Sequence, residues 1–178
     1  MTWETKDYIN RLTQHIIKYY DISIPIIDMI DAVGKIGGTV VEKEAFDSVY
    51  DPIAMKTGES SFQIYVAKHQ DEYKKRKEIS IALGHVMLHM GYMTNNSIWI
   101  AQETNIPVRF RDIEQHMQAM EFAHALLMPK DEFVCIADIN SNDKSVDAEV
   151  VAEHFNVPAY DAINRGRSIG IFQPIHPN

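Results

Sequence analysis

The chain has almost no cysteine: Cys135 is the only one among 178 residues. A single thiol excludes an internal disulfide and a zinc site built from cysteines, so a reducing cytoplasm is the expected location. No apolar run approaches the roughly 18 residues of a membrane span. The first ten residues have neither the basic nor the apolar region of a secretory signal. These absences predict a cytoplasmic protein without a membrane partner.

Positive charge is also scarce. Lysine and arginine number 17 against 25 aspartates and glutamates, which gives a formal net charge of -8. A net negative surface repels phosphates, so nucleic-acid binding would need a concentrated basic patch. The one dense run of cations, residues 74–77, is typical of a solvated surface at the start of a helix. We therefore expect a protein partner rather than nucleic acid.

The apolar residues that are present recur with helical and strand-like periods. Helical spacing predicts helices over 3–20, from Pro25 to Gly34 or the Gly37-Gly38 pair, and over about 71–91, about 111–127, 146–154 and 159–167. Strand-like patterns cover 39–42, 52–55 and 61–66, and the turn at 58–60 favours an antiparallel meander. This order indicates an α+β fold in which a small antiparallel sheet of about three strands packs against helices. We expect one domain over 1–178, with an N-terminal helix and a C-terminal helical pair.

The most informative segment is 81–89, which contains Leu83-Gly84-His85 and ends in Leu88-His89. In helices with the pattern H-E-x-x-H, two histidines four residues apart bind one Zn²⁺ and the glutamate activates the metal-bound water. The segment resembles the H-E-L-G-H-x-x-L-H version of the ImmA/IrrE family of small zinc metallopeptidases. On that pattern His85 matches the second zinc histidine. Ile81 stands in place of the first, and Ala82 in place of the catalytic glutamate.

The resemblance extends over about 24–172. Residues 122–129, Phe-Ala-His-Ala-Leu-Leu-Met-Pro, are similar to the family's F-A-x-x-L-L-M-P, and 151–158 are similar to its closing helices. Arg76 matches an arginine just ahead of the zinc helix, although a plain surface cation is an equally good interpretation. Signals that follow one another in the family's order are stronger evidence than any one of them alone.

The resemblance also implies what the site has lost. The family's third zinc ligand is a glutamate, and His116 occupies its position, three residues before Ala119. One ligand is therefore retained at His85, one is lost at Ile81, and one is changed in type at His116. The general base is lost at Ala82, so no catalytic residue of the family's kind remains. A zincin-like pseudoenzyme is the expected result.

A shifted metal site is the main alternative. His85 and His89 are themselves four residues apart, and His116 can join them if the two helices pack as in the family. Three histidines are a reasonable zinc set, so zinc is possible. Only apolar residues lie between His85 and His89, however, so no glutamate is placed to activate water. Buried, hydrogen-bonded histidines without a metal are the preferred interpretation.

Other residues near the expected cleft allow two interpretations. Helical spacing places His116 on a stripe with Ile113 and Leu127, which predicts that His116 faces the core. Six methionines act as core filler, the preferred interpretation, or as an adaptable peptide-binding surface: Met87, Met90, Met93, Met117, Met120 and Met128. The helix-turn-helix pattern at 146–167 is interpreted as structural, because its second helix has only two cations.

Active relatives cut or inactivate helix-turn-helix repressors of mobile elements and stress genes, so the resemblance implies a transcription regulator as partner. The first hypothesis is a catalytically degenerate metallopeptidase-like protein that binds such a repressor, or another protein, without cleaving it. A peptide would extend the strand at 61–66. The second hypothesis is a metal-dependent endopeptidase that uses a non-standard site of His85, His89 and His116. DNA binding through the last helices is a third and weaker hypothesis.

Overall fold

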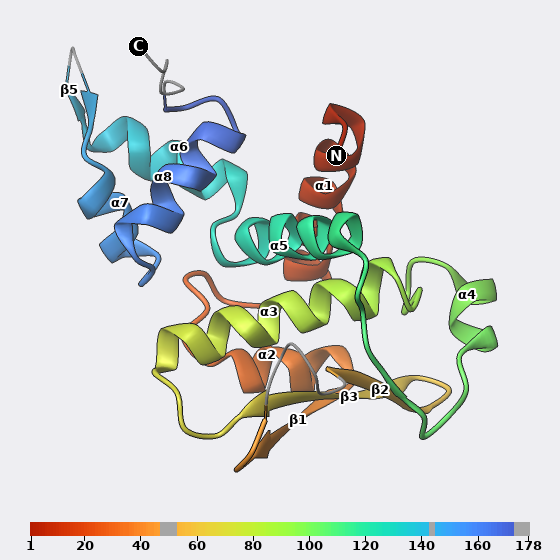
Figure 1. Ribbon diagram of the computed structural model, residues 1–178. Coiled ribbons are helices and arrows are strands. Elements are labelled where there is room, and N and C mark those ends of the chain that lie inside the picture. Colours follow the sequence, from red (N-terminus) through yellow and green to blue (C-terminus); the bar gives the residue numbers. More distant parts are fainter. Residues whose placement is uncertain (47–52, 143–144, 173–178) are drawn as a thin grey trace.

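The computed structural model describes residues 1–46, 53–142 and 145–172, and within these ranges it has the predicted α+β fold (Figure 1). The helices are α1 (Trp3–Tyr19), α2 (Met29–Ile36), α3 (Glu72–Leu88), α4 (Asn96–Ala101), α5 (Ile113–Leu127), α6 (Lys130–Ile139), α7 (Ala148–His154) and α8 (Ala159–Ser168). The strands are β1 (Gly38–Lys43), β2 (Ala54–Gly58), β3 (Ser61–Ala67), β4 (Pro107–Val108), β5 (Ser141–Asn142) and β6 (Ser145–Val146). Across the described ranges, each helix is too short or too polar to cross a membrane.

The main sheet differs from the predicted meander in its strand order, which is β1-β3-β2-β4. The turn at Glu59 and Ser60 joins β2 to β3 as an antiparallel hairpin, as expected. β1 pairs with β3 instead of β2, and this pairing is parallel. The expectation that 61–66 is an edge strand is therefore wrong, since β3 has a partner on each side. Pro52, at the start of a predicted strand, lies outside the described residues.

Capping side chains determine where the helices that carry the site begin. Asp71 accepts a hydrogen bond from the Lys74 amide at the start of α3, and Asp112 accepts one from the Gln115 amide at the start of α5. Asp28 accepts from the amides of Ile30 and Asp31, so α2 begins after Asp28 rather than at Pro25. Such caps satisfy amides that have no partner inside the helix.

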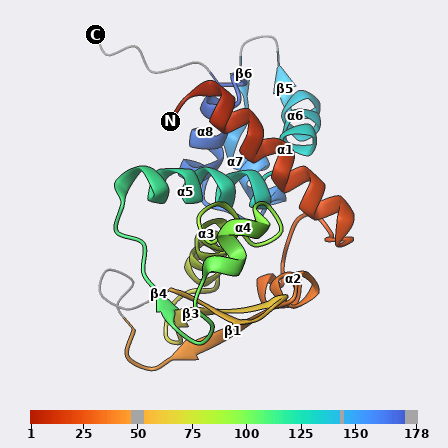
Figure 2. The same ribbon diagram turned by 90° about the vertical axis from the view of Figure 1, so that its right-hand side faces the viewer.

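The helices form layers on one face of the sheet. α2 and α3 lie against the sheet, α5 lies on the far side of α3, and α1 crosses behind α5 (Figures 1 and 2). Gly84 makes the close approach of α3 to α5 possible, because a Cβ there would lie 3.0 Å from the Ala119 carbonyl oxygen. This approach places the residue after Gly84, His85, close to the first turns of α5.

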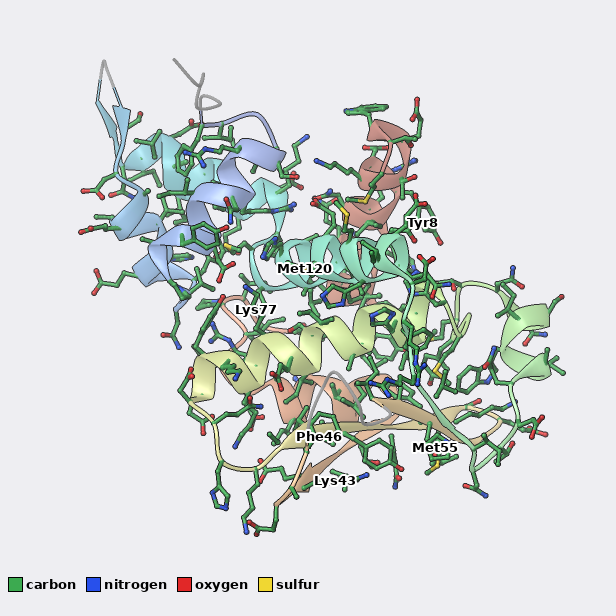
Figure 3. The ribbon with its side chains drawn as sticks, viewed as in Figure 1. Tyr8, Lys43, Phe46, Met55, Lys77 and Met120 are labelled. Carbon is green, nitrogen blue, oxygen red and sulfur yellow. The ribbon has the colours of Figure 1, made fainter. Side chains whose placement is uncertain are left out.

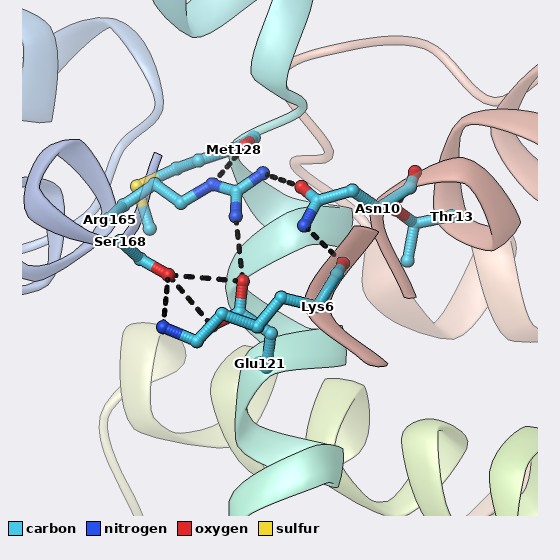
Figure 4. A network of polar contacts seen from close by, with 7 residues as sticks. All are labelled: Lys6, Asn10, Thr13, Glu121, Met128, Arg165 and Ser168. Carbon is cyan, nitrogen blue, oxygen red and sulfur yellow. Dashed lines mark hydrogen bonds and ion pairs between the residues drawn. The ribbon is translucent and has the colours of Figure 1, made fainter. Parts of the chain in front are cut away.

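The last three helices, α6 to α8, have an apolar core of their own, which includes Phe133, Val151 and Phe155. Polar contacts hold them to the rest of the chain. Arg165 on α8 is fully buried and donates to the Met128 carbonyl, to Glu121 on α5 and to Asn10 on α1 (Figure 4). A second cluster joins Tyr73 and Lys77 on α3 and His124 on α5 to Asp161 on α8. Buried Arg165 is therefore not available to contact DNA.

Candidate functional site

A cavity of about 700 Å³ opens where the sheet, α3 and the start of α5 meet. Side chains occupy the space between the sheet and α3, and Figure 3 shows Phe46, a lining residue of the cavity, beside the sheet. The sheet side of the cavity is lined by Phe46, Ile53 and Tyr65. The helix side is lined by four residues of α3 and by Ile113 and His116 in the first turn of α5. This is the cleft in which the resemblance places the peptidase site, and we call it the cleft below.

The α3 wall of the cleft consists of Glu78, Ile81, Ala82 and His85. These residues share one helix face because they are three or four positions apart. Ala82 is buried, Ile81 is half-buried, and both present only carbon atoms to the cavity. The positions that the resemblance assigns to a zinc ligand and to the general base therefore form an apolar floor.

His85 and His89 are hydrogen-bonded to each other, with their Nδ1 atoms 3.0 Å apart. The Nε2 atom of His89 lies 3.1 Å from Oε1 of Gln118 on α5. Because this amide oxygen accepts, Nε2 of His89 carries the hydrogen, and Nδ1 of the neutral ring is an acceptor. His85 therefore donates from its Nδ1. Both nitrogens of His89 are occupied within the protein.

Burial keeps the two imidazoles neutral. His85 is 1% exposed, and this burial, with smaller effects from His89 and His116, lowers the pKa of His85 to about 3. Burial also lowers the pKa of His89, although the bond to Gln118 partly opposes the shift. A buried imidazole that cannot readily accept a proton is an unsuitable general base near neutral pH.

His116 does not face the core as the helical stripe predicts. It is exposed, it lines the cleft, and its ring centroid lies 6.1 Å from that of His85. Ile113, one turn earlier, is 79% exposed. The buried residues of α5 begin only at Ala119, because the first two turns of α5 project beyond the packing surface of α3. The stripe is therefore correct for the later turns of α5 and wrong for the first.

Phe110 is a prominent cleft residue that the sequence does not reveal. Its ring stacks on His85 with centroids 4.2 Å apart and an interplanar angle of 13°. It also lies 5.8 Å from the ring of His89. Phe110 reaches this place through the pairing of β4 with β2, a contact between distant parts of the chain. Glu78, by contrast, could have been found, because it precedes Ala82 by one helical turn.

Charged groups of both signs line the mouth of the cleft. Arg109, Arg111 and Asp112 come from the connection between β4 and α5, and Glu78 comes from α3. Both carboxylates accept hydrogen bonds within the protein, Glu78 from Gln70 and Asp112 from the α5 backbone. An apolar floor with polar groups at its rim is a typical ligand-binding cavity.

Zinc, which the resemblance implies, does not fit these side chains as they are placed. A catalytic zinc site takes three protein ligands and a water molecule. Within the described parts of the chain, no three histidine, cysteine, aspartate or glutamate side chains are grouped closely enough to hold a metal ion. Ile81 offers no donor atom, and both nitrogens of His89 are hydrogen-bonded. The set of His85, His89 and His116 is thus not arranged as a metal site.

The remaining predicted residues have clear places in the fold. Arg76 is buried and donates to the carbonyls of Phe155 and Asn156 at the end of α7, so the interpretation as a surface cation is wrong. The methionines differ in burial, which agrees with core filler for some of them and leaves the peptide-binding interpretation a prediction. Met87, Met90 and Met128 are fully buried, whereas Met93 and Met117 are at least half exposed.

Comparisons with known proteins agree with this geometry. A solved structure of a Mycobacterium tuberculosis transcriptional regulator is similar in fold, with 13% identity and a TM-score of 0.54. The match covers 91% of this chain but only 50% of the regulator, so the chain spans about half the regulator's length. No curated protein matches the chain. The family model for the IrrE N-terminal-like domain (Peptidase M78) matches residues 41–165, and this chain belongs to that family.

Proposed function

We propose that this protein is a catalytically inactive member of its family that binds a segment of a partner protein in the cleft without hydrolysing it. The observation that carries the proposal is the apolar floor made by Ile81 and Ala82. Hydrolysis by the family's chemistry needs a metal-bound water and a group that takes its proton. Ile81 and Ala82 can supply neither function.

The cleft itself supports a binding role. Its volume of about 700 Å³ is ample for several side chains of a peptide, and its floor is apolar. Ile113 lines the cleft, and both Ile113 and Met117, one turn later on α5, are exposed apolar side chains. A cavity with an apolar floor and without catalytic groups of the family's kind supports binding without hydrolysis.

The proposed partner is a helix-turn-helix repressor of a mobile element. Two observations support this choice: membership of the IrrE-like family, and similarity in fold to a protein described as a transcriptional regulator. Such a repressor would bind in the cleft and be released without cleavage. The identity of the partner is thus a proposal by resemblance, whereas the apolar floor is an observation on this chain.

Site-directed photo-cross-linking tests the proposal in the native host. A photoreactive phenylalanine analogue at Ile113 should capture the partner at full length, because this position lines the cleft and is exposed. The matched control is Ile139, which is 72% exposed on α6, away from the cleft. Capture of one repressor from Ile113 and not from Ile139 supports the proposal. Equal capture from both positions contradicts it.

The alternative function, a metal-dependent endopeptidase, makes different predictions for the purified protein. Purified protein would contain about one zinc per chain, removed together with cleavage activity by a chelator and lost in a His85→Leu variant. Chelator-sensitive cleavage of the captured repressor by the unmodified chain would overturn the proposed function.

A further inference from the structure

One segment of the chain forms part of the cleft wall and pairs with the strand edge that a bound peptide would join. Residues 107–112, which we call the strap, begin with β4 and end at Asp112, the cap of α5. Figure 2 shows the strap running from β4 to the first turn of α5. Both of its ends are therefore fixed to other elements.

The strap makes the backbone contact that an added strand would make. β4 pairs antiparallel with β2, with Ala54 opposite Val108 and Met55 opposite Pro107. β2 has β3 on its other side, so a peptide cannot join β2 unless β4 leaves. Strand addition of this kind is a common way for a domain to hold a peptide.

The strap also makes the side-chain contact that an incoming residue would make. Phe110 inserts its ring against His85, in parallel stacking, at the wall that bounds the cavity. Stacked rings at this separation contribute more than the burial of their area alone. One face of the retained histidine is thus covered by the protein's own side chain.

The backbone pairing that holds the strap to β2 is nevertheless short. β4 has only two residues, and Pro107 has no amide hydrogen to donate to β2. Phe110 is only half-buried, and the four residues from Arg109 to Asp112 belong to no helix or strand. Pro107 and Val108 supply this short pairing, and Val108 and Phe110 add apolar contacts with the core, including the contacts of Phe110 with the rings of His85 and His89.

We propose that the strap is an internal occupant of the cleft that a partner must displace to bind. This proposal rests on the proposed function, because it assumes that the cleft takes a peptide. The partner would pair with β2 in place of β4 and would seat a large apolar side chain where Phe110 now lies. Release of the strap then couples partner binding to a change at the start of α5.

A disulfide lock tests whether the strap must move. Residues directly opposite in an antiparallel pair have Cα atoms about 4.5–5.5 Å apart, a separation that suits a disulfide. Ala54→Cys with Val108→Cys, in a Cys135→Ser background, joins β4 to β2. Met55→Cys with Pro107→Cys is a second lock at the neighbouring pair. Each locked protein has an ideal control, which is the same variant after reduction.

The probe is 8-anilinonaphthalene-1-sulfonate, an aromatic anion that fluoresces in apolar cavities. The locked form should bind it about tenfold more weakly than the reduced form, and Phe110→Ala should bind it about tenfold more tightly than the wild type. Phe110→Leu, which keeps an apolar side chain, should stay near the wild type. Adding Ile113→Glu at the cleft should abolish the gain of Phe110→Ala, which excludes an effect of partial unfolding. Equal affinities in the locked and reduced forms, or no gain in Phe110→Ala, would overturn the proposal.

The two proposals fail separately. The dye measurements need no partner, so they decide the role of the strap even if cross-linking from Ile113 captures nothing. Conversely, cross-linking from Ile113 that captures the partner equally well, whether the strap is locked by the disulfide or free, would support partner binding and would refute displacement of the strap.

Discussion

Arg165 on α8 donates a hydrogen bond from Nη1 to Oε1 of Glu121 on α5, over 3.1 Å, in a site from which solvent is almost excluded. The same guanidinium donates to Asn10 over 2.6 Å and to the Met128 carbonyl over 3.0 Å. Burial lowers the pKa of Arg165 to about 10, so it remains charged at neutral pH. One side chain thereby joins α1, α5 and α8 (Figure 4).

Removing this cation should be strongly destabilising. Arg165→Met leaves Glu121 as a buried carboxylate without its cation, with only the Ser168 hydroxyl as a donor among the described residues, and we expect a loss of about 3–5 kcal/mol in the free energy of unfolding, measured with urea. The control is Arg11→Met, which breaks an exposed ion pair with Asp7 and should have little effect. Adding Glu121→Gln to Arg165→Met should recover part of the loss. Equal effects of Arg165→Met and Arg11→Met would show that the network contributes little.

Acid should destabilise the fold through His85. The pKa of His85 is lowered to about 3 in the folded state and is about 6.5 in an unfolded chain. The unfolded state therefore binds more protons between these values, so stability is full above about pH 6.5 and declines as the pH falls towards 3. At pH 5 the contribution lost is about 2 kcal/mol, to an order of magnitude.

Urea unfolding at pH 7.5, 6 and 5, with a chelator present, measures this effect. His85→Gln should unfold with a weaker dependence on pH than the wild type, because the titrating group is gone. An identical pH dependence in wild type and His85→Gln would show that protonation of His85 does not cause the loss of stability in acid.

Two glycines on helices should respond oppositely to alanine. At Gly84 a Cβ would meet the Ala119 carbonyl oxygen at 3.0 Å and the Ala119 Cα at 3.1 Å, and backbone atoms cannot easily yield. Gly84→Ala should therefore destabilise by about 1–3 kcal/mol despite its better helix propensity. Gly34 has nothing within 4 Å of its Cβ position, so Gly34→Ala should stabilise α2 by about 0.5–1 kcal/mol. Thermal unfolding measures this difference: the melting temperature should fall in Gly84→Ala and rise in Gly34→Ala.

Local patterns in the sequence were enough for most of the fold. Aspartates cap α3 and α5 at the residue before each helix, and the Gly58-Glu59-Ser60 turn joins the hairpin, because each signal acts over a few residues. Pairing of β1 with β3 could not be predicted in this way, since nothing near β1 selects its partner. The short helix α4 and helix α6 also lacked a strong periodic signal.

The residues of the candidate site also differ in whether local sequence patterns can predict their positions. Ile81, Ala82 and His85 could be placed on one face because spacing along a single helix determines it. The orientation of His116 depends instead on how far α5 extends beyond α3, a property of packing that helical spacing does not contain. Phe110 on His85 depends on strand pairing between residues more than 50 positions apart.

Restoring the lost groups tests the alignment of the cleft with active relatives. Ile81→His, Ala82→Glu and His116→Glu together supply the ligands and base that the resemblance assigns to these positions, beside the retained His85. Tight zinc binding, measured by calorimetry and by metal content after dialysis, should appear in the triple variant and not in the wild type.

Phe110 should limit that affinity, because its ring covers one face of His85 and the strap crosses the same wall. Adding Phe110→Ala to the triple variant should therefore tighten zinc binding further, whereas Phe133→Ala, a deletion of the same ring in the separate core of α6 to α8, should not. His85→Leu in the triple variant is the negative control and should abolish binding. A triple variant that folds normally but binds no zinc would show that Ile81 and His116 are not the positions of the family's ligands, and the apolar floor could then no longer be taken as the trace of a lost metal site.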